Sequence, residues 1–152
     1  MTIDGGEAAR RRSPPEALAA LRERVNADLD GRSVGHPPTR VSVCEPGSDS
    51  YRYLLESFPD AGHPNEITLL SRELALGYKP GSYIEQVAPT PLLMILAGAD
   101  TLTPVDMQRE AFARALEPKH LVVLDGATHY QPYIERFSES SSAARDWFLQ
   151  HL

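Results

Sequence analysis

The spacing of apolar residues changes near residue 88. Before this point they recur at intervals of three and four, which is typical of amphipathic helices. The clearest helix is predicted to start with a capping box, in which Ser13 is the cap and Glu16 its partner. Its apolar face consists of Leu18, Leu21, Val25 and Leu29. A shorter helix is predicted over residues 49–57, and another one is capped by Asn65. Residues 41–44 allow at most a short strand, because prolines and glycines interrupt the sequence around them.

From residue 88 onward, continuous apolar segments alternate with amphipathic ones. Residues 92–97 are apolar throughout, as expected for a strand of a parallel sheet that is covered on both faces. Thr103 is predicted to cap the next helix, whose buried side consists of Met107, Ala111, Phe112, Ala115 and Leu116. A second strand is predicted at residues 121–124, before a closing helix with the apolar stripe Tyr133, Phe137, Ala144, Trp147, Phe148 and Leu152. Because a helix joins the two strands, they are predicted to run parallel.

These patterns predict an α/β protein in three segments. Residues 1–12 are rich in glycine and charge and are expected to form a disordered tail. Residues 13–88 are expected to form a helical lid or cap, and residues 89–152 a strand-helix-strand-helix unit. Two parallel strands do not make a domain, so the outer edge of residues 92–97 is predicted to be open. Such an edge favours pairing with another chain, and we expect a dimer or a larger oligomer.

Composition narrows the classes of partner. The net charge of -6 argues against nucleic acid, because phosphate binding needs clustered Lys and Arg on one face. The longest apolar run, PLLMILAGA, falls well short of the roughly 20 residues that cross a membrane. Cys44 is the single cysteine, which excludes an internal disulfide and fits a reducing, cytoplasmic location.

An aspartate and a histidine follow the two predicted strands. Asp100 comes after the first strand and His129 after the second. Since the carboxyl ends of parallel strands meet at one edge of a sheet, both side chains are expected to lie there. An acid and a histidine in this order are half of a Ser-His-Asp site, but no GxSxG nucleophile turn occurs in the chain. The alternative is a loop aspartate that caps the next turn and a histidine on the surface.

The sequence predicts neither a metal nor a cofactor. The histidines lack the HxH, HExxH and CxxC spacings of metal sites, being scattered over His36, His63, His120, His129 and His151. No glycine-rich phosphate loop stands between a predicted strand and a helix.

The residues around the acid and the histidine resemble the C-terminal part of the α/β-hydrolase superfamily. In that family the acid commonly follows a Gly-x-x-Asp turn with a nearby proline. Asp100 and Pro104 match this motif, although Ala97 stands at the glycine position and Gly98 comes one residue later. The small-residue turn before the histidine is matched by Gly126, Ala127, Thr128 and His129. Over residues 50–152 the amino-acid sequence is similar to those of dienelactone-hydrolase-like proteins, which include polyketide transferases and hydrolases of secondary metabolism.

The resemblance implies a partial α/β-hydrolase fold, a helical lid segment plus the last two parallel strands with their helices. It also implies that His129 takes a proton from a serine hydroxyl while Asp100 holds the other ring nitrogen. Tyr130 and Tyr133 flank the histidine, where they either line a pocket for the substrate or serve as packing residues.

Two functions follow as hypotheses. In the first, the chain is the C-terminal segment of a hydrolase for an ester, thioester or related small-molecule acyl substrate, inactive without an N-terminal half that carries the nucleophile. In the second, it is a non-catalytic interaction or scaffold module that recruits a partner, or a second copy, through the open strand edge.

Overall fold

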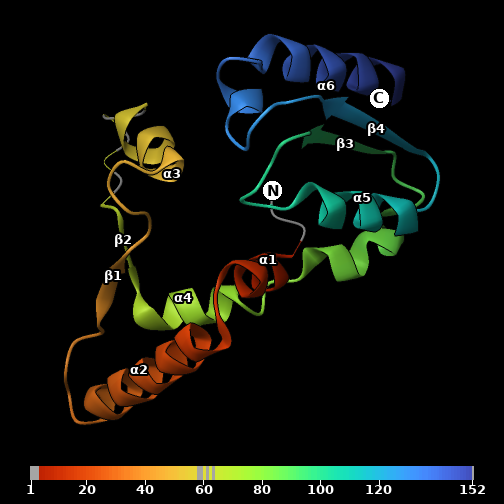
Figure 1. Cartoon of the computed structure of the whole chain (residues 1–152). Coiled ribbons are helices and arrows are strands. Elements are labelled where there is room, and N and C mark those ends of the chain that lie inside the picture. The colour runs from red at the N-terminus through yellow and green to blue at the C-terminus, as the bar shows by residue number, and fades with distance from the viewer. Residues whose placement is uncertain (1–3, 58–59, 61, 63, 152) are drawn as a thin grey trace. The chain divides into compact units, whose positions relative to one another are not determined.

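The chain forms two compact units. The computed structural model describes residues 4–57, 60, 62 and 64–151. One unit is Ala9–Tyr78, and the other is Lys79–Leu152 together with Met1–Ala8. Figure 1 traces the helices and strands of both units from the N-terminus in red to the C-terminus in blue.

Residues 5–12 differ from the disordered tail that the sequence predicts. They form helix α1, Gly5–Arg12. The Asp4 carboxylate accepts a hydrogen bond from the Glu7 backbone N–H at 2.8 Å, as a helix cap does. Glu7 lies in the first turn and the arginines in the last, an order that suits the helix dipole. Residues 1–3 of the predicted tail lie outside the described residues.

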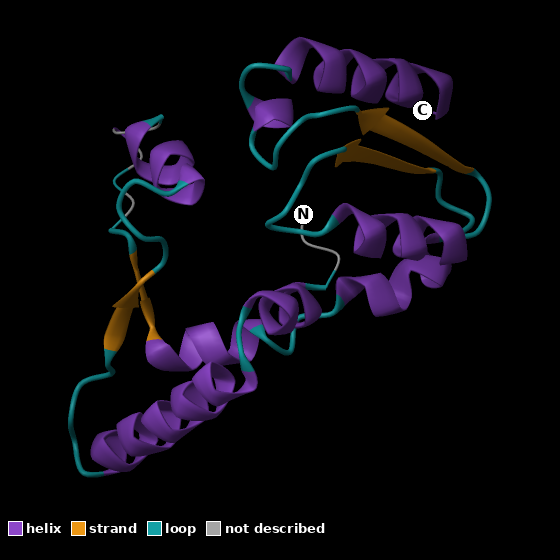
Figure 2. Ribbon diagram, in the orientation of Figure 1, coloured by secondary structure: helices purple, strands orange, loops and turns teal. Residues whose placement is uncertain are grey.

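The unit Ala9–Tyr78 combines helices with a small sheet. Its long helix α2 packs against α4, and β1 pairs with β2 in a two-stranded antiparallel sheet (Figure 2). In chain order its elements are α2 (Pro15–Ser33), β1 (Arg40–Ser42), α3 (Asp49–Tyr51), η1 (Arg52–Glu56), β2 (Glu66–Thr68) and α4 (Leu69–Ala75). The predicted lid is therefore not wholly helical, because residues 66–68 extend beside β1.

Thr68, and not Asn65, caps α4. The Thr68 side chain accepts a hydrogen bond from the Ser71 backbone N–H at 3.1 Å. Asn65 has a positive φ of 50° and binds both main-chain groups of Cys44 through its side chain. Asparagine tolerates this backbone conformation, so it serves as the turn before β2.

Cys44 is buried in the same turn, and its thiol donates to the Asn65 side chain at 3.1 Å.

In the described part of the chain, no helix is both long enough and apolar enough to pass through a membrane. The cytoplasmic location stays a prediction.

The second unit is a parallel sheet with helices. Strands β3 (Leu92–Ala97) and β4 (Lys119–Leu124) pair in parallel, with Leu92 opposite Lys119 and Ala97 opposite Leu124. The parallel pairing confirms the sequence prediction. The helices α5 and α6 lie on opposite faces of this sheet (Figure 1). The helical elements are η3 (Pro80–Val87), α5 (Val105–Arg114), η4 (Gln131–Tyr133) and α6 (Phe137–His151).

The core of this unit explains why it begins at Lys79, earlier than the predicted boundary at residue 88. Ile84 of η3 packs with Met94 and Leu96 of β3 and with Ala111 and Ala115 of the α5 region. All of these residues are buried. The segment before β3 therefore supplies part of the sheet's apolar cover.

The closing helix is less buried than its apolar stripe predicts; Leu152 of that stripe lies outside the described residues. Phe137 and Phe148 are 59% and 57% exposed, and α6 has no fully buried residue among those described. Leu116, predicted on the buried side of α5, is also exposed. The α5 stripe otherwise turns inward, with Ala111 completely buried.

Leu96→Ala should destabilise this unit strongly. Leu96 is 2% exposed and belongs to the largest fully buried side chains that the structure describes. Its truncation leaves a cavity, and we expect the free energy of unfolding to fall by about 2–5 kcal/mol. Urea unfolding followed by circular dichroism measures this. The control Leu149→Ala, at a side chain that is 78% exposed, should change stability by no more than about 0.5 kcal/mol. Equal effects of the two variants would contradict the burial of Leu96.

Candidate active site

The loops after β3 and β4 are bonded to each other. The Gly98 N–H donates to the Leu124 carbonyl at 2.9 Å, and the Ala99 N–H donates to the Ala127 carbonyl at 2.8 Å. A Cβ atom at position 98 would lie 3.1 Å from the Leu124 carbonyl oxygen, so glycine allows this close approach. The glycine that comes one residue late in the acid motif therefore has a structural purpose.

This approach brings Asp100 and His129 together. The Nδ1 atom of His129 lies 2.8 Å from Oδ2 of Asp100. The Asp100 side chain is 4% exposed and the His129 side chain 21% exposed. The acid is thus enclosed, while the imidazole reaches the surface of a cavity. Nε2, on the opposite side of the imidazole ring, is the nitrogen that can face a reacting group.

Asp100 accepts further hydrogen bonds from its own loop. Its Oδ1 accepts from the backbone N–H groups of Leu102 and Thr103, both at 2.9 Å. Its Oδ2 accepts from the Thr103 hydroxyl at 2.5 Å. Burial raises the pKa of Asp100, but the hydrogen bonds from His129 and Thr103 outweigh burial and hold this pKa below its usual value. The carboxylate therefore stays ionised at neutral pH.

The sequence alone does not identify Thr103 and Gln108 as site residues. Thr103 was predicted to cap α5, but Pro104 occupies the cap and the Thr103 side chain binds Asp100 instead. Gln108 donates from Nε2 to the Thr103 carbonyl at 2.7 Å and lies 3.3 Å from the Thr103 hydroxyl. The spacing of Thr103, three residues after Asp100, is the local signal that could have indicated this, since threonine and aspartate side chains commonly form hydrogen bonds within a few residues of the chain.

The two tyrosines beside His129 differ in position. The ring of Tyr130 meets the His129 ring edge to face, with centroids 4.6 Å apart. Tyr133 lines the cavity and is 49% exposed. Tyr133 is thus placed where a substrate-binding residue could act, whereas Tyr130 supports the imidazole.

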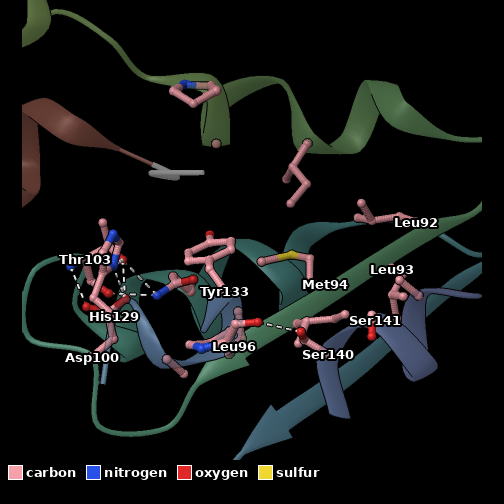
Figure 3. Close-up of a pocket in the computed structure, with 18 of the residues that line it drawn as sticks. Leu92, Leu93, Met94, Leu96, Asp100, Thr103, His129, Tyr133, Ser140 and Ser141 are labelled. Atoms are coloured by element: carbon pink, nitrogen blue, oxygen red, sulfur yellow. Dashed lines mark hydrogen bonds and ion pairs between the residues drawn. The ribbon is translucent and has the colours of Figure 1, made fainter. Parts of the chain in front are cut away.

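The cavity has a volume of about 790 Å³ and runs along the outer edge of β3. Every residue of β3 lines it and none of β4 does; η3 and α6 supply other parts of the wall. Figure 3 shows Asp100, Thr103 and His129 clustered at one end of the cavity. The walls are mainly apolar side chains, among them Ile84, Leu96 and Phe148.

The serines that line this cavity are not beside His129. Figure 3 shows Ser140 and Ser141 across the cavity from the Asp100 and His129 side chains. Their hydroxyls donate to main-chain carbonyls, Ser140 to Pro132 at 2.6 Å and Ser141 to Ser138 at 3.4 Å. Both serines lie in α6. Across the described residues, no group of three or more His, Cys, Asp or Glu side chains could hold a metal ion.

Comparisons with known proteins place this geometry in a known fold. A thiohydrolase of Eupenicillium brefeldianum is 29% identical over 138 residues, which cover 76% of this chain and 45% of that protein. A polyketide transferase of Gibberella fujikuroi is 34% identical over 123 residues, covering 76% and 38%. The crystal structure of the α/β-hydrolase GrgF from Penicillium sp. sh18 matches with a TM-score of 0.75 at 22% identity, over 98% of this chain and 52% of that one.

The chain has the fold of the C-terminal part of an α/β-hydrolase. The predicted fold class is confirmed, including the two parallel strands with their helices. The chain spans less than half the length of the two curated relatives. No protein-family model matches it.

The stability of this α/β-hydrolase unit should depend on the charge of Asp100. Because its folded pKa lies below the unfolded value of about 3.9, the ionised form stabilises the folded state. This contribution is complete above the unfolded pKa and is lost as the pH falls through the folded pKa. We expect Asp100→Asn to lower the free energy of unfolding by about 1–3 kcal/mol at pH 7, and by less in acid.

Urea unfolding at a series of pH values measures this dependence. The matched control is Asp125→Asn, in the neighbouring loop at an exposed position, with an expected change of no more than about 0.5 kcal/mol. A constant difference between wild type and Asp100→Asn down to pH 2 would contradict a buried, ionised carboxylate.

Proposed function

We propose that this chain supplies the acid and the base of a Ser-His-Asp site that hydrolyses or transfers an acyl group from an ester, thioester or related small molecule. The observation that carries the proposal is the 2.8 Å hydrogen bond between His129 and the buried Asp100, at the edge of a parallel sheet. Relatives named thiohydrolase and polyketide transferase support acyl chemistry.

The roles of the two side chains follow from their exposure. Nε2 of His129 takes the proton of a serine hydroxyl as the oxygen attacks the acyl carbon, and later returns it to the leaving group. Asp100 accepts the Nδ1 hydrogen bond, keeps the ring oriented and stabilises the imidazolium that forms. The acid needs no contact with the substrate, and it has little exposed surface.

The serine comes from outside this sequence. The 152 residues contain no GxSxG turn, and the serines of the cavity bond to the main chain. The nucleophile and its oxyanion-hole amide would therefore stand on a preceding segment or on a separate polypeptide. Without them, the chain alone should lack hydrolase activity, because removing a triad serine costs on the order of 10⁶-fold in turnover.

The outer edge of β3 is the place for that missing part. The N–H groups of Leu92 and Gly98 point to β4, where they donate to Pro118 and Leu124. Because N–H groups alternate along a strand, those of Leu93 and Ile95 point to the outer edge. A strand from the nucleophile-bearing part can pair with this edge and fill the apolar cavity beside it.

A chimera tests the catalytic roles. The corresponding C-terminal segment of the fungal thiohydrolase is replaced by this chain, and turnover of p-nitrophenyl acetate and of an acyl thioester is measured. We expect activity, and a loss of about 10⁴–10⁶-fold in kcat on His129→Ala. The control His120→Ala, at an exposed histidine of β4, should keep the activity. A folded, active chimera that is indifferent to His129→Ala would exclude the proposed base.

The open edge predicts self-association of the chain by itself. Static light scattering should give a dimer or a larger species, because an unpaired strand edge pairs with a second copy when its own partner is absent. Leu93→Pro removes one outward N–H and should shift the protein towards the monomer. The control Leu93→Ala loses the same side chain but keeps the N–H, and should still associate. A wild-type monomer at all concentrations would contradict an available edge.

A further inference from the structure

A chain of buried polar side chains stands behind the Asp100–His129 pair. Asp100, Thr103 and Gln108 are each 7% exposed, and they are consecutive members of one hydrogen-bonded series. Asp28 is the remaining charged or polar residue of that degree of burial in the described residues, and it lies in the other unit. Burial of polar groups is costly unless they bond, so the series is a specific arrangement.

The direction of each hydrogen bond in the series is determined. The Thr103 carbonyl can only accept, so the group of Gln108 that lies 2.7 Å from it must be the amide NH₂. The same NH₂ group lies 3.3 Å from the Thr103 hydroxyl oxygen, to which it donates. The Thr103 hydroxyl then directs its own proton to the ionised Oδ2 of Asp100, 2.5 Å away.

The Thr103 hydroxyl has one competing acceptor. Its oxygen lies 3.4 Å from Nδ1 of His129. A hydroxyl that turned to donate there would favour the tautomer with the proton on Nε2, and this tautomer cannot accept a proton from serine at Nε2. With the hydroxyl proton on Asp100, Nδ1 keeps its own proton and donates to Oδ2.

We propose that Thr103 and Gln108 are positioning residues, which act through Asp100 to hold His129 with its proton on Nδ1 and its lone pair on Nε2. This inference rests on the proposed function, since the Nε2 lone pair matters only if His129 is the base. Among the described residues Gln108 forms its side-chain hydrogen bonds with Thr103, and not with His129 or Asp100; it acts by setting the direction of the Thr103 hydroxyl. Figure 3 shows the dashed contacts that join Thr103 to Asp100 and His129.

The two residues divide the task. Thr103 anchors Asp100 twice, through its backbone N–H on Oδ1 and its hydroxyl on Oδ2, and so restrains rotation of the carboxylate. Gln108 lies on the helix that follows, and its amide NH₂ group donates to both the carbonyl and the hydroxyl oxygen of Thr103. Through Gln108, helix α5 thereby holds Thr103, at the end of the Asp100 loop that is farther from β3 in the sequence.

NMR of the full 152-residue chain tests the inference without any need for activity. Long-range ¹H–¹⁵N correlation reports which nitrogen of neutral His129 carries the proton, and the ¹³Cγ shift of Asp100 reports its titration. In wild type we expect the Nδ1–H tautomer. In Thr103→Val, which keeps the shape but loses the hydroxyl, the titration of Asp100 should move to higher pH, because one donor to the carboxylate is gone.

Thr103→Ser should restore the wild-type titration, and Gln108→Met should shift it in the same direction as Thr103→Val, by less. The control is Thr101→Val, at an exposed threonine of the same loop, with no shift. A proton on Nε2 in wild type, or an Asp100 titration that is unchanged in both Thr103→Val and Gln108→Met, would overturn the inference. Gln108→Met keeps the test available should Thr103→Val fail to fold.

Activity separates this inference from the proposed function. In the active chimera, Thr103→Val should lower kcat on the order of 10²-fold with KM nearly unchanged, since misplacement of the base affects chemistry and not binding. An inactive chimera with the expected tautomer and titrations refutes the proposed function alone. An active chimera whose kcat is indifferent to Thr103→Val refutes the positioning role alone.

Discussion

The hydrogen bond between Asp100 and His129 depends on two main-chain contacts between their loops. Parallel pairing ends with Ala97 opposite Leu124, and the contacts of Gly98 with Leu124 and of Ala99 with Ala127 continue it past the strands. The two loops that carry Asp100 and His129 are therefore held together by main-chain hydrogen bonds. Such placement suits the catalytic roles proposed for the pair, because proton transfer needs its partners within about 3 Å.

Asp100 and His129 differ in their environment: the aspartate is buried and the histidine is partly exposed. Asp100 is buried without a neighbouring Lys or Arg in its hydrogen bonds, and its charge is stabilised by Leu102, Thr103 and His129. Fixed donors of this kind keep a carboxylate ionised at little cost in reorganisation. His129 is left partly exposed to the cavity, so the group that exchanges a proton in the proposed mechanism is the one that can reach a substrate.

The sequence predicted the elements whose pattern is local and missed those that depend on distant partners. The predicted strand at residues 92–97 matches β3 in full. A short, continuously apolar segment between loops is typical of a parallel strand that is covered on both faces. The sequence allowed a short strand at residues 41–44, which overlaps β1, but its antiparallel pairing joins it to a three-residue strand far away in the chain, and no period reveals β2. Thr103 satisfied the rule for a cap, but Asp100 offered a charged acceptor three residues away and outcompeted the helix end.

Strand β3 connects the chemistry to the open edge. Its carboxyl end carries Asp100, and the N–H groups of Leu93 and Ile95 point to its outer edge, beside which the described sheet has no further strand. A parallel strand added there would end at the same side of the sheet as Asp100, so a turn that follows it would face His129. A strand added antiparallel would end at the opposite side and bring nothing to the imidazole. The orientation of whatever pairs with β3 thus decides between an active site and a simple assembly contact.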